Sequence, residues 1–95
     1  IILIFDECSS GFRQTFGGLH KYYNVNPDIA VFGKTLGNGY AINAIIGKDK
    51  IMKSIENTFI SSTFWTERVG PTAALKVIDI MEKSRLGRLL KRRGY

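Results

Sequence analysis

The chain has 95 residues, of which 44% are hydrophobic and 23% charged, and its formal net charge is +6. This composition is ordinary for a globular protein, and the longest apolar runs are far too short to span a bilayer, which excludes a membrane-embedded protein. Five positive charges come from the last eleven residues, while the charges elsewhere almost balance, so the basic character is confined to the segment 85–95.

The ends of the chain and its cysteine content bear on organisation and compartment. The chain begins at Ile1, inside an apolar run, and it ends in a basic, helix-like stretch without a closing element. We therefore expect an internal fragment of a larger protein, with residues 1–95 forming a single partial domain. The lone Cys8 excludes an internal disulfide and is compatible with a reducing cytoplasm, where we expect the protein to act.

The first predicted element is a strand over residues 2–5, which are continuously apolar and typical of a strand buried on both faces in a parallel sheet. It ends at Asp6 and Glu7; taken alone, such a pair is as readily a strand-end or helix-capping pair as a functional one. Residues 9–28 are rich in glycine, serine, asparagine and aromatic residues and predict a loop. Its single histidine, His20, is interpreted as a surface or packed residue rather than a ligand.

A second short strand is predicted over residues 29–32, and it ends at Gly33 and Lys34. Ligands bind at the carboxyl ends of strands in open α/β sheets. If the two strands are parallel neighbours, Asp6 and Lys34 therefore lie at the same edge. Each of these charged groups is costly beside a buried strand unless it has a partner or a use.

Further elements follow Lys34. Residues 35–40 predict a tight turn, residues 41–46 a third strand closed by Gly47, and residues 48–56 a short amphipathic helix. After a loop over residues 57–70, a helix is predicted from Pro71 to about Ser84. The order of these elements predicts part of an α/β domain with a mostly parallel sheet flanked by helices.

Four motifs, in this order and spacing, resemble the class-III aminotransferases, which are fold-type-I enzymes that depend on pyridoxal 5′-phosphate (PLP). The motif that begins at Asp6 is similar to that of the branch containing glutamate-1-semialdehyde aminomutase. The four motifs stand here as Leu3-Ile4-Phe5-Asp6-Glu7, Ser10-Gly11-Phe12-Arg13, Asn26-Pro27-Asp28-Ile29 and Gly33-Lys34-Thr35-Leu36-Gly37-Asn38-Gly39-Tyr40. The resemblance covers residues 1–83 and implies that the chain is the core of the large PLP-binding domain.

The resemblance also implies roles for individual residues. Lys34 would form the Schiff base with PLP and then move the proton of the substrate, and Asp6 would hold the pyridine nitrogen protonated. Cys8 occupies a position that resembles a contact with the ring face, although a packed cysteine is equally compatible with the sequence. Thr63, in a Ser-Thr-Phe segment, would bind the cofactor phosphate of the neighbouring subunit.

From these roles we expect a homodimer with shared active sites that acts on a small amino or keto substrate. The upstream phosphate cup and the small C-terminal domain of the family are absent, so the chain alone should show little or no activity. Residues 65–70 depart from the family pattern near the substrate side. Transamination and 1,2-migration of an amino group use the same residues, and the sequence identifies neither the substrate nor which reaction occurs.

Parts of the sequence also suggest two other functions, a nucleotide-binding P-loop and a basic binding module. A nucleotide-binding P-loop is excluded because its first glycine is replaced by Asp28, and because the Walker-like segments occur in the wrong order. The alternative that stays open is a non-catalytic basic module that binds nucleic acid or another acidic partner through residues 85–95. No aromatic signature of RNA binding accompanies that segment, so a solvated helix face is favoured and nucleic acid is not the expected partner.

Overall fold

The structure is a computed structural model that describes residues 1–93. Gly94, Tyr95 and the side chain of Lys91, which belong to the predicted basic segment, lie outside the described residues. None of the described helices is long and apolar enough to cross a membrane.

Three short strands form one sheet in the order β1 (Ile4–Asp6), β2 (Ile29–Phe32) and β3 (Ala44–Gly47). The predicted α/β class is confirmed, and β1 and β2 are parallel, but β3 runs antiparallel to β2, so the sheet within this chain is mixed. The reason is the length of the connection. A parallel return needs a crossover of about a dozen residues or more, usually with an α-helix, whereas residues 33–43 contain only a single 3-10 turn.

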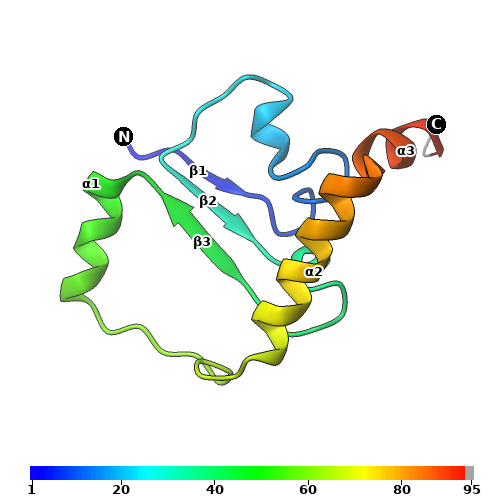
Figure 1. Cartoon of the computed structure of the whole chain (residues 1–95). Helices are drawn as coiled ribbons and strands as arrows, with labels where there is room; N and C mark the ends of the chain where they lie inside the picture. The colour runs from blue at the N-terminus through cyan, green and yellow to red at the C-terminus, as the bar shows by residue number, and fades with distance from the viewer. Residues whose placement is uncertain (94–95) are drawn as a thin grey trace.

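Six helical segments accompany the sheet within the described residues 1–93. Short 3-10 helices follow the first two strands, and the chain continues through one short helical stretch and a long connection to two further helices (Figure 1). Their bounds are η1 (Leu19–Lys21), η2 (Lys34–Leu36), α1 (Asp49–Met52), η3 (Lys53–Asn57), α2 (Val69–Ser84) and α3 (Leu86–Arg93). The predicted helix over residues 48–56 is thus an α-helical turn that tightens into a 3-10 helix.

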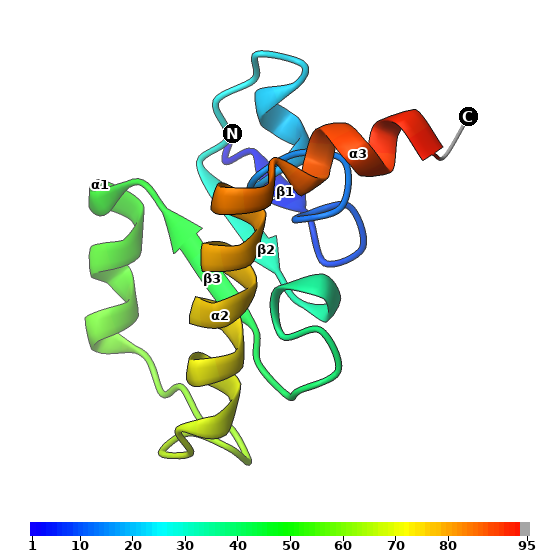
Figure 2. The ribbon, with the colours of Figure 1, turned by 45° about the vertical axis from the view of Figure 1, so that its right-hand side comes forward.

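Helix α2 covers one face of the sheet, as Figures 1 and 2 show. Ala74 of α2 packs with Ala30 and Phe32 of β2 and with Leu36 of η2, and partly buried apolar side chains surround this cluster. Ala30 and Phe32 alternate with Ile29 and Val31, so β2 presents its buried alanine and phenylalanine to the helix and its β-branched residues to the other side. The opposite face of the sheet is left uncovered by any described helix.

The prediction that residues 2–5 are buried on both faces was wrong for this chain. Ile2 and Ile4 are each 56% exposed. The physical reason is that β1 is an edge strand that pairs with β2 alone, and pairing begins only where Ile4 lies beside Ile29. The same effect shortens the third strand, because β3 starts where Ala44 pairs with Phe32.

Candidate active site

Lys34 occupies an unusual backbone conformation. It is the first residue of η2, and its φ of 42° lies in the left-handed region that disfavours residues with a side chain. Such a conformation costs on the order of 1–3 kcal/mol and persists only where the surrounding structure enforces it. The side chain is exposed, and Nζ donates a hydrogen bond of 2.5 Å to Oγ of Ser9. The turn therefore presents the amine outward, against the loop that follows β1.

Asp6 ends β1 and lies on the uncovered face of the sheet. It pairs in register with Val31, whereas its neighbour Phe5 pairs with Ala30 of the core, and paired residues share a face. One carboxylate oxygen, Oδ1, accepts a hydrogen bond of 3.0 Å from the backbone amide of Cys8. This bond, a second from the Cys8 thiol and the charge of Lys34 lower the pKa of Asp6, so the carboxylate is ionised at neutral pH.

Cys8 and Gly33 form the surface between Asp6 and Lys34. The thiol is partly buried, and its hydrogen bond to Asp6, together with burial, raises its pKa, so it stays protonated. A Cβ atom at Gly33 would lie 2.6 Å from Oδ1 of Asn43 and 3.4 Å from Sγ of Cys8. Glycine is thus the residue that leaves room for these two side chains at the carboxyl end of β2.

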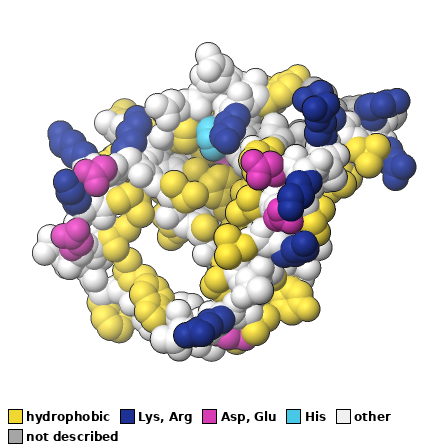
Figure 3. Space-filling view, viewed as in Figure 1, with side chains coloured by type: hydrophobic (Ala, Val, Ile, Leu, Met, Phe, Trp, Pro, Cys, Tyr) yellow, Lys and Arg dark blue, Asp and Glu magenta, His cyan; other side chains and the backbone are white. Residues whose placement is uncertain are grey.

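Thr63 lies in the long connection between η3 and α2, which in Figure 3 borders an opening beside the sheet. It lines a cavity of about 850 Å³ together with Lys34, Asn43 and Ile45 of the sheet side. Ile45 pairs with Val31, so this residue of the lining is on the same face of the sheet as Asp6. Of the four residues that the sequence singled out, Asp6, Cys8 and Lys34 lie around the carboxyl ends of β1 and β2, whereas Thr63 lies across a cavity that Lys34 also lines.

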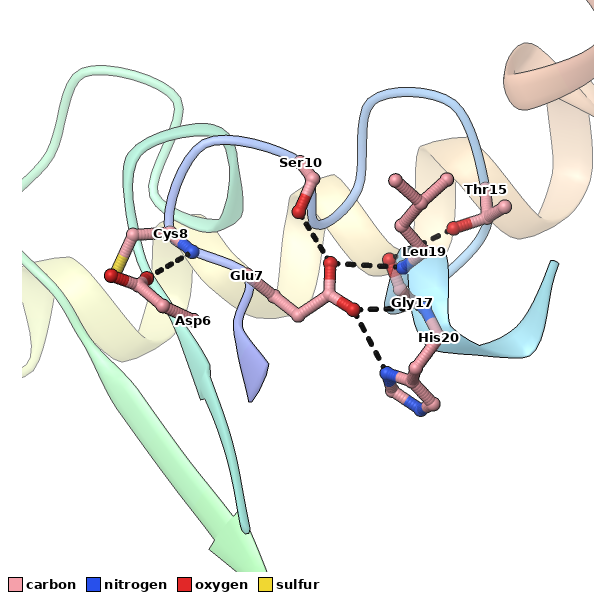
Figure 4. Close-up of polar contacts among 8 residues, drawn as sticks. All are labelled: Asp6, Glu7, Cys8, Ser10, Thr15, Gly17, Leu19 and His20. Carbon is pink, nitrogen blue, oxygen red and sulfur yellow. Dashed lines mark hydrogen bonds and ion pairs between the residues drawn. The ribbon is translucent and has the colours of Figure 1, made fainter. Parts of the chain in front are cut away.

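The sequence analysis missed a polar cluster around Glu7, which Figure 4 shows on the opposite side of the chain from Asp6. Glu7 is 1% exposed, and its carboxylate accepts hydrogen bonds from Ser10 Oγ, from the backbone amides of Leu19 and His20 at 2.9 Å, and from His20 Nδ1 at 3.0 Å. Burial alone would raise the pKa of Glu7, but the hydrogen bonds from Ser10, His20 and Leu19 outweigh it and lower the pKa to about 2.

A signal for this cluster was present in the sequence but ambiguous. Successive side chains of a strand point to opposite faces. The carboxylate of Glu7, directly after Asp6, therefore points to the face opposite Asp6, towards the core. What the sequence could not reveal was the fold of residues 10–20, which brings His20 back to within 3.0 Å of Glu7. His20 is therefore a packed residue, as interpreted, but it is packed in an ion-pair geometry.

The donor set fits PLP and does not fit a metal ion. The described residues contain no group of three or more His, Cys, Asp or Glu side chains that could hold a metal. They do hold an outward-facing amine beside an ionised carboxylate, which is what a cofactor with an aldehyde and a basic ring nitrogen requires. The left-handed turn at Lys34 and the close packing at Gly33 fix the position of the amine at this edge.

Comparison with known proteins agrees with this reading. The 3-aminobutyryl-CoA aminotransferase of Cloacimonas acidaminovorans is 46% identical over 90% of the chain, and the glutamate-1-semialdehyde 2,1-aminomutase of Methanothrix thermoacetophila is 36% identical over 99%. The chain spans only 21% and 23% of these relatives. A structure of the PLP form of FumI from Sphingopyxis sp. MTA144 matches with a TM-score of 0.78 and 28% identity, covering 83% of this chain and 19% of that one.

One of these two relatives is an aminotransferase and the other is a 2,1-aminomutase. The model of the family described as aminotransferase class-III matches residues 1–94, almost the whole chain. With the amine and the carboxylate placed at one sheet edge, the motifs, the fold and the match agree, and the chain belongs to the class-III aminotransferase family.

Proposed function

We propose that this chain forms the lysine and aspartate side of a PLP site in an enzyme that transfers an amino group, either between substrates or between neighbouring carbons of one substrate. The observation that carries the proposal is the parallel pairing of β1 and β2, which brings Asp6 and Lys34 to one edge of the sheet. Because the curated relatives are four to five times longer, we further propose that residues 1–95 are a partial domain of a longer enzyme.

PLP, when bound, supplies an aldehyde that condenses with amines and a ring that takes up electrons from the substrate. Lys34 would hold PLP through Nζ, and the same amine, when free, would accept and return the proton of the substrate α-carbon. The Ser9 hydroxyl, which accepts the Nζ hydrogen bond, would orient that amine. The Asp6 carboxylate would accept a charge-assisted hydrogen bond from the ring nitrogen and so keep it protonated.

Two other residues complete the proposed site. Cys8, fixed beside Asp6 by its thiol hydrogen bond, provides a soft, uncharged contact for the ring face. Thr63 binds the cofactor phosphate through its hydroxyl, on the neighbouring subunit of a homodimer as the family resemblance implies. The proposed substrate is a small amino or keto compound, and the proposed compartment is the cytoplasm, with which a single unpaired cysteine is compatible.

The proposal is tested on the full-length protein that carries this chain. We expect borohydride reduction of the purified protein to fix PLP on Lys34, which peptide mass spectrometry detects as a mass increase on the peptide that contains it. The Lys34→Ala variant should lose both the fixed cofactor and turnover. The matched control is Lys50→Ala, which removes an exposed lysine of α1 and should leave both unchanged. Cofactor fixed on another lysine, or no cofactor at all, would refute the proposal.

The basic segment does not favour a second function. Arg85, which caps the end of α2, is exposed, and α3 carries exposed arginines at 88, 92 and 93. Because α3 also has exposed Leu89 and Leu90, the described part is a short amphipathic helix rather than a continuous cationic surface.

A further inference from the structure

Glu7 has no part in the proposed chemistry, yet it is the most deeply buried charged side chain among the described residues, at 1% exposure. A buried carboxylate is expensive unless each oxygen is hydrogen-bonded. Here every bond is present, which means that the surrounding loop is organised around this one group. This loop begins directly after Asp6, which belongs to the proposed site.

The donors come from two separated parts of the loop after β1. Ser10 donates from the first turn, while Leu19 and His20 donate from η1. The main chain of Glu7 is bound as well, because its amide donates to the carbonyl oxygen of Val31 at 2.8 Å and its carbonyl oxygen accepts from the amide of Gly11 at 2.7 Å. Glu7 thus ties the end of β1 to β2, to the turn and to η1 at once.

Asp6 depends on this anchor because strand pairing ends at it. Its register partner is Val31, the last pair between β1 and β2. Beyond Asp6, the turn that carries the Cys8 amide to Oδ1 of Asp6 is closed by the bond between Glu7 and Gly11. Figure 4 shows the two carboxylates pointing to opposite sides of the chain, each holding a different part of the same turn. Any rotation of the backbone at Glu7 would therefore swing Asp6.

We propose that Glu7, clamped by Ser10, Leu19 and His20, is a positioning residue that fixes the carboxylate of Asp6 against the ring nitrogen of the cofactor. This inference rests on the proposed function for the identity of the ligand. The clamp itself is a property of the chain and can be tested with or without cofactor.

The test compares substitutions of two carboxylates in the full-length protein: Glu7, which follows the carboxyl end of β1, and Asp28, which binds Leu3 just before the amino end of β1. Glu7→Gln keeps the size of the side chain, but its amide group must face a backbone N–H of Leu19 or His20 and leaves that donor unpaired. The control is Asp28→Asn. Asp28 also ties β1 to its surroundings, through hydrogen bonds of 2.8 Å from the amide of Leu3 and from Nζ of Lys48, but at the end remote from Asp6.

The first readout is hydrogen exchange of the Cys8 amide in cofactor-free protein. We expect Glu7→Gln to speed its exchange about tenfold, and Asp28→Asn to leave it unchanged, since a loss of about 1.4 kcal/mol in closing the turn is a factor of ten. The second readout is the dissociation constant of PLP, which should rise about tenfold in Glu7→Gln alone. If Glu7→Gln does not fold, Ser10→Ala, which removes one donor, should shift both readouts in the same direction by less.

Unchanged exchange at Cys8 in Glu7→Gln, or equal effects of Glu7→Gln and Asp28→Asn, would overturn the inference and leave the proposed function standing. Wild-type protein that takes up no PLP would instead overturn the proposed function, and with it the ligand of the inference, even where the exchange rates follow the pattern expected of the clamp.

Discussion

At the residue scale, the adjacent carboxylates of Asp6 and Glu7 have different surroundings and different proposed roles. Asp6 and Glu7 alternate in direction, so one faces the open side of the sheet and the other the core loop. The sequence predicted that Asp6 and Lys34 share an edge, because strand ends can be read from apolar runs. It could not predict the depth at which Glu7 lies, because that depends on how residues 10–20 fold back over it.

The depressed pKa of Glu7 leads to a prediction about acid stability. Its folded-state pKa of about 2 lies below the ordinary 4.5, so its stabilisation is complete above pH 4.5 and is lost as the pH falls towards 2. The loss is at most about 3.5 kcal/mol, since each pKa unit corresponds to about 1.4 kcal/mol. We expect the free energy of unfolding of wild-type protein to exceed that of Glu7→Gln at pH 6 and to converge with it near pH 2, measured by urea denaturation. A constant difference across this range would contradict the prediction.

At the scale of elements, strand and helix identities followed from local pattern, whereas their ends were set by neighbours. The apolar runs predicted all three strands, but β1 and β3 extend only as far as they pair with β2. Helix α2 is predicted to begin at Pro71 but begins at Val69. Proline fits anywhere in the first turn of a helix, so the helix can start two residues before Pro71. The direction of β3 could have been inferred from the short connection that precedes it.

Gly70, in the first turn of α2, gives a prediction at this scale. A Cβ atom there would lie 2.4 Å from the carbonyl oxygen of Ala41 and 3.1 Å from Cβ of Ile42. The backbone of α2 is therefore in contact with the backbone of the segment that leads into β3. Gly70→Ala should destabilise the full-length protein by about 1–3 kcal/mol in urea denaturation despite the better helix propensity of alanine. Val69→Ala, at a half-exposed neighbouring site, is the control and should cost less than about 1 kcal/mol. A gain in stability in Gly70→Ala would show that the contact yields.

At the scale of the whole molecule, much apolar surface is uncovered. Phe59 is 94% exposed, Trp65 66% and Ile45 59%, and Ile45 lies on the open face of the sheet. Patches of this kind mark surfaces that other protein covers. The sequence indicated their hydrophobicity but gave no means of knowing that α2 protects one face only, because that follows from a single covering helix within the described residues.

For the isolated 95-residue chain we therefore expect self-association and no transaminase turnover. Sedimentation velocity should show a mean mass that rises with concentration, because exposed apolar side chains gain from burial against one another. Replacing Phe59 and Trp65 with serine should reduce this association. A chain that stays monomeric at high concentration, or that turns over an amino donor unaided, would contradict the expectation.

The backbone of Lys34 has a consequence for how this position tolerates change. Its left-handed conformation suits glycine or asparagine better than lysine, so the side chain lowers the stability of the turn in which it sits. Selection for a stable fold alone would remove a lysine from this place. On the proposed function, a lysine in this conformation is retained for its amine at the expense of stability, and a change to glycine in a descendant sequence would indicate that the proposed chemistry had been lost.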